Sequence, residues 1–340
     1  MAGLAALMAS PALPAFAAAP ATGAGRPKGP RLRPGDTIGL IEPASRSDES
    51  LDITMVEEAV AAMGLKSKRG KHVLDQFGYL AGQDKGRASD LTAMFADKQV
   101  RAIFAVRGGW GSARLLPFVD WDVVRANPKF VLGYSDITAL HMAIAAKGGA
   151  MTLHGPNASS SWGQASVDSF RSVAFDGATP LYQNPVGSED RLVQRRWRTE
   201  VLTGGRAQGH LLGGNLTVLT ALAGTPYLPS FDGAILFLED VDEAEYRIDR
   251  MLTQLGQAGV LAKLAGVVFG QCTSCKAPDG SSSPFTLSDI LRQHLGSLGV
   301  PAYQGAWFGH IGDQFTLPVG ARAEIDADAG TLRLLESAVT

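Results

Sequence analysis

The sequence has few aromatic residues, few cysteines and no excess of charge of either sign. Aromatic residues make up 7%, and the two cysteines are too few to build a disulfide scaffold. With 31 basic and 33 acidic residues, the chain lacks the basic excess of a sequence-independent nucleic-acid binder. No apolar segment approaches the ~20 residues that a membrane-spanning helix requires. These absences argue against a disulfide-built domain, a nucleic-acid partner and a membrane span.

The composition that remains is that of a folded α/β protein. Apolar residues make up 45% of the 340 residues and the net charge is only −2, which argues against a disordered chain. At ~150 residues per domain, this length predicts two domains. Forty glycines are typical of α/β proteins with short turns between strands and helices. We expect a soluble, two-domain α/β enzyme.

The first 25 residues form an alanine-rich segment without a charged residue before Arg26. Ala15-Phe16-Ala17 has the small-residue pattern of a signal-peptide cleavage site, but the basic residues that begin such a signal are missing. If the segment is a signal, the protein is periplasmic or otherwise exported; if it is a low-complexity tail, the protein is cytoplasmic. We exclude residues 1–30 from the fold.

From residue 33 the chain alternates apolar runs with helical patterns. This alternation predicts strands at 37–41, 102–106 and 130–134, and helices at 49–63, 87–95 and 136–147. Strands and helices at this spacing favour a parallel sheet, whose working residues gather at the carboxyl ends of the strands.

A polar, poorly periodic segment divides the chain. We expect an N-terminal domain at 31–160, a linker at 161–207 and a C-terminal domain at 208–340. The second domain is expected to contain the strands 234–238 and 266–270 and a helix between them at 243–257.

One serine stands where a predicted strand turns into a helix. Ser135 follows Gly133-Tyr134, and such a turn lifts the hydroxyl above the sheet, beside the N–H groups that begin the helix. This placement suits a nucleophile with a site for an oxyanion. However, Ile137 stands where a lipase-type turn has its second glycine. Ser135 or Asp136 would also serve as a helix cap, and the pattern leaves both interpretations open.

An acid and a histidine elsewhere in the chain are candidate partners for this serine. Glu239 follows the apolar run 234–238, where a carboxylate is unfavourable unless it has a role such as orienting a histidine. The acids after it are expected on a solvated helix, since Glu243 is spaced to pair with Arg247. His310 lies in a glycine-rich loop. His154 is its best rival, and spacing alone does not decide between them.

Two short motifs complete the candidates. The loop Arg107-Gly108-Gly109-Trp110-Gly111-Ser112 follows a strand but matches no nucleotide-binding pattern, and it could offer backbone N–H groups to an oxyanion. Cys272-Thr273-Ser274-Cys275 lacks the second pair of ligands that a zinc site needs. These cysteines form a local disulfide if the protein is exported, or two free thiols in the cytoplasm.

Taken in order, these segments resemble the L,D-carboxypeptidases, a family of serine peptidases that trim murein peptides. The resemblance extends over about residues 33–330. The matching segments are Gly78-Tyr79-Leu80-Ala81-Gly82, Ala105-Val106-Arg107-Gly108-Gly109-Trp110-Gly111, Gly133-Tyr134-Ser135-Asp136-Ile137-Thr138-Ala139-Leu140, Leu153-His154-Gly155-Pro156, Gly213-Gly214-Asn215-Leu216, Phe237-Leu238-Glu239-Asp240, Tyr246-Arg247-Ile248-Asp249-Arg250, Gly309-His310 and Leu317-Pro318-Val319-Gly320.

The resemblance implies a fold and a catalytic triad. It implies an N-terminal parallel-sheet domain of the flavodoxin or glutamine-amidotransferase kind, which carries the nucleophile, and a smaller mixed α/β C-terminal domain. Ser135 would be the nucleophile, His310 the general base and then the acid, and Glu239 the group that holds the imidazolium. The active site would form between the two domains.

The family's loops suggest further site residues. From their place in the loops, the backbone N–H groups of Gly109 and Asp136 are expected to form the oxyanion hole. Arg107 is a candidate partner for a substrate carboxylate, because a guanidinium binds a carboxylate through two hydrogen bonds, or it pairs with an acid of the protein. Trp110 and Tyr134 are further substrate-binding candidates.

The implied reaction removes the terminal D-alanine from a murein tetrapeptide and leaves a tripeptide, with no metal or other cofactor. The expected partner is the murein peptide, and family members are commonly homodimers. One alternative is the immunity-type branch of the family, which hydrolyses the peptidyl-nucleotide microcin C. It would need an aromatic surface such as Trp110, Trp162 or Trp307. A non-catalytic murein-peptide binder is a further alternative, against which the intact triad argues.

Overall fold

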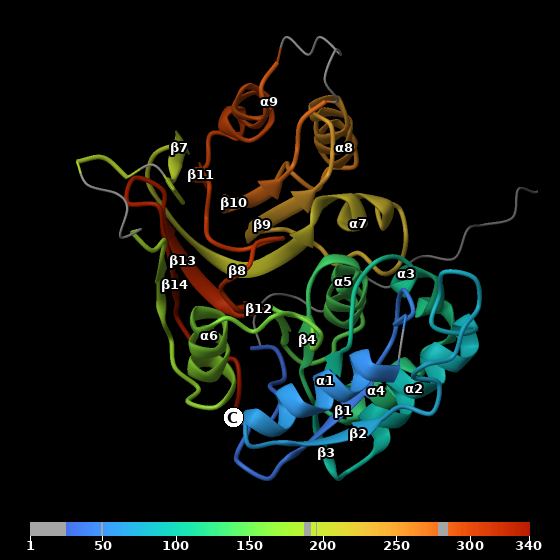
Figure 1. The fold of residues 1–340 in the computed structure, drawn as a ribbon. Helices are drawn as coiled ribbons and strands as arrows, with labels where there is room; N and C mark the ends of the chain where they lie inside the picture. Colours follow the sequence, from blue (N-terminus) through green and yellow to red (C-terminus); the bar gives the residue numbers. More distant parts are fainter. Residues whose placement is uncertain (1–24, 49, 187–191, 195, 278–284) are drawn as a thin grey trace, which may run out of the picture.

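The computed structural model describes residues 25–48, 50–186, 192–194, 196–277 and 285–340, which form two β-sheets with helices around and between them (Figure 1). The alanine-rich segment, for which a signal or a tail was predicted, lies almost entirely outside these residues. The mixed α/β architecture with a mostly parallel first sheet confirms the predicted fold class.

The first sheet has six strands in the order β12-β5-β4-β3-β1-β2. Five run parallel, and β12 is antiparallel to its neighbour β5. The strands are β1 (Thr37–Ile41), β2 (Lys66–Arg69), β3 (Val100–Ala105), β4 (Val131–Gly133), β5 (Thr152–His154) and β12 (Leu317–Val319). The inner strands β3 and β4 are nearly continuous apolar runs because helices cover both faces of a parallel sheet.

The second sheet is mixed and has eight strands in the order β6-β14-β13-β8-β9-β10-β11-β7. Its four strands β8 to β11 run parallel, and antiparallel strands extend it at both edges. The strands are β6 (Leu181–Gln183), β7 (Glu200–Thr203), β8 (Arg206–Asn215), β9 (Ala234–Val241), β10 (Gly266–Thr273), β11 (Ala302–Gln304), β13 (Arg322–Asp326) and β14 (Thr331–Leu334).

Helices cover the sheets and fill the space where they meet. The helices are α1 (Ser50–Ala62), α2 (Asp84–Ala96), α3 (Ser112–Leu115), α4 (Trp121–Ala126), α5 (Thr138–Ala146), α6 (Gln164–Ala174), α7 (Leu216–Ala221), α8 (Glu245–Gln257) and α9 (Leu287–His294), with short 3₁₀ turns η1 (Leu116–Phe118), η2 (Ser135–Ile137) and η3 (Gly296–Leu298). Figure 1 shows α5 and α7 between the two sheets. Residues 138–145 of α5 are all buried, because a helix enclosed by two layers has no solvated face.

The segment 161–207, predicted as a linker, has structure of its own. It contains α6, and its strands β6 and β7 form the two edges of the second sheet. In the opposite direction, β12 returns from the C-terminal part of the chain to the first sheet. We propose 31–160 and 208–340 as the two domains. They are joined by the segment 161–207 and by β12, which pairs with the first sheet.

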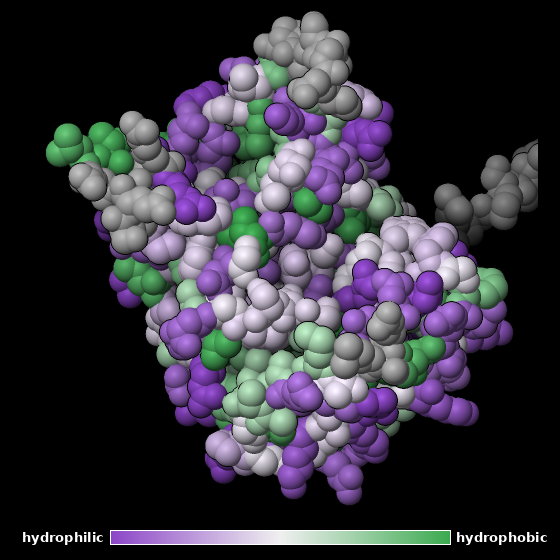
Figure 2. Space-filling model, viewed as in Figure 1, coloured by the Kyte–Doolittle hydropathy of each residue, from purple (hydrophilic) through white to green (hydrophobic). Residues whose placement is uncertain are grey.

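The surface carries no large apolar face on the side shown in Figure 2, where hydrophobic side chains are scattered among hydrophilic ones. Within the described residues, no helix has both the length and the apolar character needed to cross a membrane.

Candidate active site

Ser135 lies at the carboxyl end of β4, in a backbone conformation that is unusual for its residue type. Its φ is 64°, in the left-handed region, which costs a non-glycine residue roughly 1–2 kcal/mol. The N-cap positions of η2 and α5 are Tyr134 and Ile137, so neither Ser135 nor Asp136 caps these helices. The capping interpretation is therefore wrong, and a strained turn of this kind is typical of residues at functional sites.

The side chain of Asp136 fastens the glycine-rich loop beside this turn. Its carboxylate accepts a hydrogen bond from the backbone N–H of Ser112 at 2.7 Å, where α3 begins. Burial raises the pKa of Asp136, and the hydrogen bonds from Ser112 and the charge of Arg87 oppose that rise. The loop also runs close to the serine and leaves no room for a side chain: a Cβ added to Gly108 would lie 3.1 Å from the Cβ of Ser135.

The loop after β11 supplies a histidine, and β9 of the second sheet supplies a glutamate, in line with this serine. The Nε2 atom of His310 lies 3.0 Å from the Ser135 hydroxyl oxygen, and its Nδ1 atom lies 2.7 Å from Oε2 of Glu239. Glu239 is fully buried within β9, which continues past the predicted end of the strand. Its other oxygen, Oε1, is buried without a hydrogen-bond partner in the described part of the chain. This carboxylate therefore acts chiefly on the imidazole.

Opposing effects set the protonation of His310. Burial lowers its pKa, but the hydrogen bond and charge of Glu239, with the charges of Asp240 and Asp242, raise the pKa above its ordinary value. In the same cluster, burial and the charge of Glu239 raise the pKa of Asp240 to about 6. A stabilised imidazolium is what a general base needs after it has taken the proton of a serine.

The glycine before His310 is required by its surroundings. Gly309 has a φ of 119°, and a Cβ at this position would lie 3.0 Å from the Cβ of Glu239 and 3.1 Å from the carbonyl oxygen of Gln271. A side chain here would push the loop off β9 and β10. The absence of a side chain therefore lets the histidine approach Glu239.

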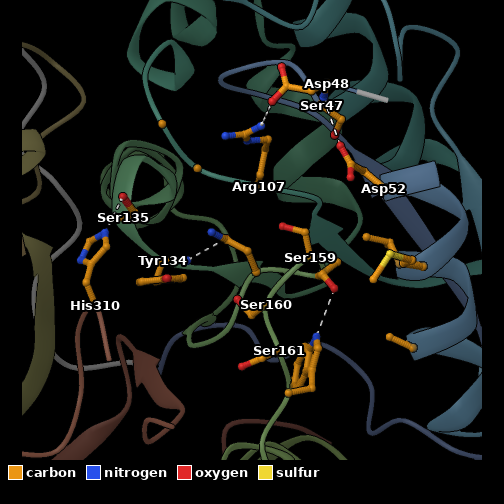
Figure 3. Close-up of a pocket in the computed structure, with 18 residues that line it drawn as sticks. Ser47, Asp48, Asp52, Arg107, Tyr134, Ser135, Ser159, Ser160, Ser161 and His310 are labelled. Atoms are coloured by element: carbon orange, nitrogen blue, oxygen red, sulfur yellow. Dashed lines mark hydrogen bonds and ion pairs between the residues drawn. The ribbon is translucent and has the colours of Figure 1, made fainter. Parts of the chain in front are cut away.

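Ser135 and His310 lie at one side of a pocket of about 680 Å³, a size common for small-molecule sites. Figure 3 shows Arg107 and Tyr134 among the side chains around the same cavity. The Tyr134 ring lies 4.8 Å from the His310 ring, centroid to centroid. Trp162 also lines the pocket, so one of the three predicted tryptophans is available to a ligand.

Two predicted substrate-binding residues differ in their placement. The guanidinium of Arg107 donates to the backbone oxygen of Arg46 at 2.9 Å and lies 3.9 Å from a carboxylate oxygen of Asp48, which is largely exposed. Trp110 lies outside the pocket lining, and its backbone N–H donates to the Ser45 hydroxyl at 3.1 Å. The structure thus brings Arg107 to the pocket but not the side chain of Trp110.

The rival histidine has a different environment. His154 is completely buried, and neither of its ring nitrogens has a hydrogen-bond partner among the described residues. Burial lowers its pKa well below the ordinary value, so the ring stays neutral. It packs edge-on against Phe237, Phe308 and the pocket residue Tyr134. The hydrogen bond to Ser135 belongs to His310.

The side chains that join the two halves of the site were not predicted from the sequence. The backbone N–H of Asn215 donates to the hydroxyl of Thr138 at 2.9 Å, three residues after the serine. Asn215 pairs with Glu239 in the register of β8 and β9, so this bond links α5, which follows the serine, to the strand beside the glutamate's. Asn157 accepts a hydrogen bond from the Tyr134 backbone at 3.1 Å. Thr138 and Asn215 lie in segments that resemble the family, but a motif gives no distance.

In the ranges that the structure describes, no group of three or more histidine, cysteine, aspartate or glutamate side chains is arranged to hold a metal ion.

Comparison with known proteins gives two matches that together cover most of the chain. Residues 38–155 match the LD-carboxypeptidase N-terminal domain, and residues 208–325 match the LD-carboxypeptidase C-terminal domain.

Relatives named as murein peptide carboxypeptidases and a relative named as a microcin self-immunity protein resemble the chain over nearly its whole length. A probable murein peptide carboxypeptidase of Bacillus subtilis (strain 168) is 37% identical over 87% of this chain and 90% of its own. A murein tetrapeptide carboxypeptidase of Pseudomonas aeruginosa is 30% identical, over 86% of this chain and 93% of its own. The microcin C7 self-immunity protein MccF of Escherichia coli is 27% identical, over 90% of this chain and 94% of its own.

Solved structures include both kinds of protein. MccF in complex with glutamyl sulfamoyl guanosine has a TM-score of 0.80 and 26% identity, covering 92% of this chain and 99% of that one. The muramoyltetrapeptide carboxypeptidase from Oxalobacter formigenes has a TM-score of 0.75 and 27% identity, covering 88% and 97%.

Proposed function

The chain belongs to the LD-carboxypeptidase family and is a serine-type carboxypeptidase, and we propose that it removes the terminal D-alanine from murein tetrapeptides. The observation that carries the proposal is the line of hydrogen bonds from Ser135 through His310 to Glu239 beside an open pocket. The B. subtilis and P. aeruginosa relatives, both named for murein peptides, support this substrate over others.

In this proposal the three residues divide the reaction as in other serine triads. His310 takes the proton of Ser135 as the hydroxyl oxygen attacks the carbonyl carbon of the scissile amide, and Glu239 stabilises the imidazolium that results. His310 then gives the proton to the leaving amine of D-alanine. Water attacks the acyl-enzyme by the same route and releases the tripeptide.

We assign the oxyanion hole to the backbone N–H groups of Gly109 and Asp136. The position of Gly108 supports this assignment: a Cβ added there would lie 3.1 Å from the Cβ of Ser135, so the glycine-rich loop runs next to the nucleophile. Removing a donor of this kind typically costs ~10²–10³ in turnover.

Arg107 is proposed to bind the free carboxylate of the terminal D-alanine. It is the only arginine or lysine among the described residues that line the pocket, and its partner Asp48 is exposed and weakly held at 3.9 Å. A substrate carboxylate would replace that weak pair. Tyr134, whose ring lies against His310, would close the side of the pocket on which His310 lies.

A peptidyl-nucleotide substrate is the second candidate, favoured by the placement of Trp162. This side chain lines the pocket and is fixed by a hydrogen bond from its Nε1 to the backbone oxygen of Ala158 at 3.1 Å. An aromatic ring held in this way could stack on a nucleobase. The similarity to MccF supports this alternative.

One assay separates the two substrates. L-Ala-γ-D-Glu-diaminopimelate-D-Ala and glutamyl sulfamoyl guanosine are each incubated with the wild type and with Ser135→Ala, with and without EDTA, and the products are identified by mass spectrometry. Loss of one alanine from the peptide with the wild type alone supports the proposal. Cleavage of the nucleotide analogue alone would replace it with the second candidate, and cleavage by both proteins would remove Ser135 from its role.

Assembly and location are also proposed. We propose a homodimer, for which Val186, Leu192 and Val193 offer exposed apolar side chains near one another in the chain. Light scattering on the wild type and on Leu192→Glu tests this assembly.

We also propose export, supported by the signal-like residues 1–25 and by the disulfide between Cys272 and Cys275. A reporter that is active only outside the cytoplasm, fused after residue 30, tests the export; a silent reporter on a normally expressed fusion contradicts it.

A further inference from the structure

The two cysteines flank a threonine at the end of β10, beside the loop that carries His310. Cys272 and Cys275 form a disulfide, with their Cα atoms 5.4 Å apart. Both cysteines are half-buried, and Ser274 between them is exposed. A dissolved thiol can therefore reach this bond, which closes a turn of only four residues.

The end of β10 holds the His310 loop at two places. The backbone N–H of Gln271 donates to the carbonyl oxygen of Phe308 at 2.9 Å. The hydroxyl of Thr273 donates to the carbonyl oxygen of His310 itself at 2.7 Å. The second contact fixes the backbone from which the imidazole reaches both Glu239 and Ser135.

The turn that presents Thr273 is held in a disfavoured backbone conformation. Ser274 has a φ of 58°, in the left-handed region that residues other than glycine rarely adopt. The carbonyl of Thr273 accepts from the backbone N–H of Asp242 at 2.9 Å, and the N–H of Cys275 donates to the carbonyl of Cys272 at 3.4 Å. The disulfide between Cys272 and Cys275 closes this same turn, with Ser274 inside it.

We propose that Thr273 is a positioning residue for His310 and that the disulfide between Cys272 and Cys275 is a reducible clamp on it. When the clamp opens, Ser274 relaxes, the Thr273 hydroxyl leaves the His310 carbonyl, and the imidazole loses its alignment with Ser135. The inference rests on the proposed role of His310 as the general base, and it adds a redox control to that site.

The reductant is a dithiol. One of its thiolates attacks a sulfur of the protein disulfide and forms a mixed disulfide, and its second thiolate then attacks that bond. The protein gains two thiols, and the dithiol becomes a disulfide, so two electrons and two protons pass to the protein. An oxidant of the disulfide class reverses the exchange.

The position of the clamp predicts which kinetic constant changes. Cys272, Thr273 and Cys275 are not among the described residues that line the pocket, so substrate binding should be little affected. Alignment of the nucleophile and its base should suffer, and a displacement of about 1 Å in an active site can cost ~10²-fold in rate. We expect reduction to lower kcat by about tenfold or more, with KM nearly unchanged.

The test uses the full chain, oxidised and after treatment with dithiothreitol, with two readouts. One is kcat and KM for the murein tetrapeptide. The other is the rate at which a fluorophosphonate labels Ser135, which needs no substrate. Both kcat and the labelling rate should fall on reduction and recover on reoxidation. The double variant Cys272→Ser/Cys275→Ser should have the low values throughout and should not respond to dithiothreitol.

Variants of the threonine test the positioning role without any redox treatment. Thr273→Val, which keeps the shape but lacks the donor, should have a low kcat and a low labelling rate, whereas Thr273→Ser should keep both near wild type. Thermal unfolding followed by circular dichroism identifies a variant whose loss comes from unfolding. If Thr273→Val unfolds, Thr273→Ser, which keeps the hydroxyl donor, is compared with the wild type instead.

The clamp is overturned if kcat and the labelling rate are the same in both redox states, or if Thr273→Val equals the wild type. A redox effect on labelling without any cleavage of the tetrapeptide would keep the clamp and reject the proposed substrate. Cleavage of the tetrapeptide at the same rate in both redox states would keep the proposed substrate and reject the clamp. A wild type that is never labelled at Ser135 would reject both.

Discussion

The two halves of the site are built in different ways. On the serine side, the turn itself aims the hydroxyl: Ser135 sits at the end of β4 with a φ of 64°, and the Asp136 carboxylate fastens the neighbouring loop at 2.7 Å. On the histidine side, distant strands position the residue: His310 is held by Glu239, 71 residues away, and by Thr273, 37 residues away. The nucleophile is placed by local backbone geometry and the base by long-range contacts.

This difference predicts that the two sides tolerate change differently. A strained turn is fixed once its strand and helix form, whereas a loop held by hydrogen bonds depends on the second sheet being complete. The bond between Thr138 and Asn215 joins the two systems at 2.9 Å. Substitutions on the serine side should therefore test the placement of the nucleophile by its backbone turn. Substitutions on the histidine side should test the support of the base by distant side chains.

The largest effect is expected on the histidine side, from Glu239→Gln. The amide keeps the shape but removes the charge that stabilises the imidazolium, and it can hold the ring in the wrong tautomer. We expect kcat on the tetrapeptide to fall by about 10⁴-fold with the fold intact. Asp232→Asn is the matched control, because Asp232 is an exposed acid that pairs with Lys263 at the surface. A Glu239→Gln enzyme within tenfold of the wild type would contradict the role of Glu239.

On the serine side, Arg107→Gln should have the next largest effect. If Arg107 binds the terminal carboxylate, the loss of a charged hydrogen-bonding partner should lower kcat/KM by roughly 10–100-fold. The reduction should lie mainly in KM and should vanish for a substrate whose terminal carboxyl is an amide. Arg206→Gln removes an exposed arginine that pairs with Asp326 and serves as the control. An equal loss with the amide substrate would assign Arg107 a structural role instead.

A smaller effect on the same side should follow from Gly108→Ala. The new methyl group would lie 3.1 Å from the Cβ and 3.3 Å from the hydroxyl oxygen of Ser135, so the serine must shift by a few tenths of an ångström. We expect kcat to fall by about tenfold, since small misplacements of reacting groups are costly. In Gly256→Ala the nearest atom to the new methyl group lies 3.8 Å away, so that variant should keep full activity. Equal rates for the two variants would show that the glycine loop does not confine the nucleophile.

The smallest expected effect is a shift in pH dependence. Glu239 helps to raise the pKa of His310 above its ordinary value, and His310 must be neutral to accept a proton. Activity should therefore be present at higher pH and lost as the pH falls through a value above ~6.5. The residual activity of Glu239→Gln should persist to a lower pH than the wild-type activity, so the acidic limb of its pH profile should lie at lower pH. A kcat/KM profile checks this, and an unmoved limb would assign it to another group.

The fold was predictable from the sequence where strands are buried on both faces. The apolar runs at 37–41 and 234–238 matched β1 and the start of β9 for that reason. The strand β2 (Lys66–Arg69) was missed because it is a polar edge strand, and residues 206–215 gave no apolar run although they form β8. Both strands, β2 at an edge and β8 inside its sheet, draw their stability from pairing, which local composition does not record.

The site was predictable in part. The turn at Ser135 could be recognised as a nucleophile candidate because its chemistry is local, although the same pattern also allowed a cap. The choice between His310 and His154 could not be made from spacing, because 175 residues separate His310 from Ser135 and the sequence gives no distance between them. The family resemblance supplied that choice. The burial that leaves His154 neutral is a property of the packed interior.

The central claim is that His310, in the loop after β11, activates Ser135, in the turn after β4. Its most direct test is the covalent labelling of the wild type and of His310→Gln by a fluorophosphonate, with the modified residue mapped by peptide mass spectrometry. The account predicts rapid labelling of Ser135 alone in the wild type, and labelling slower by orders of magnitude in His310→Gln while the fold is retained. Labelling of another serine, or of Ser135 at the same rate in both proteins, would contradict it.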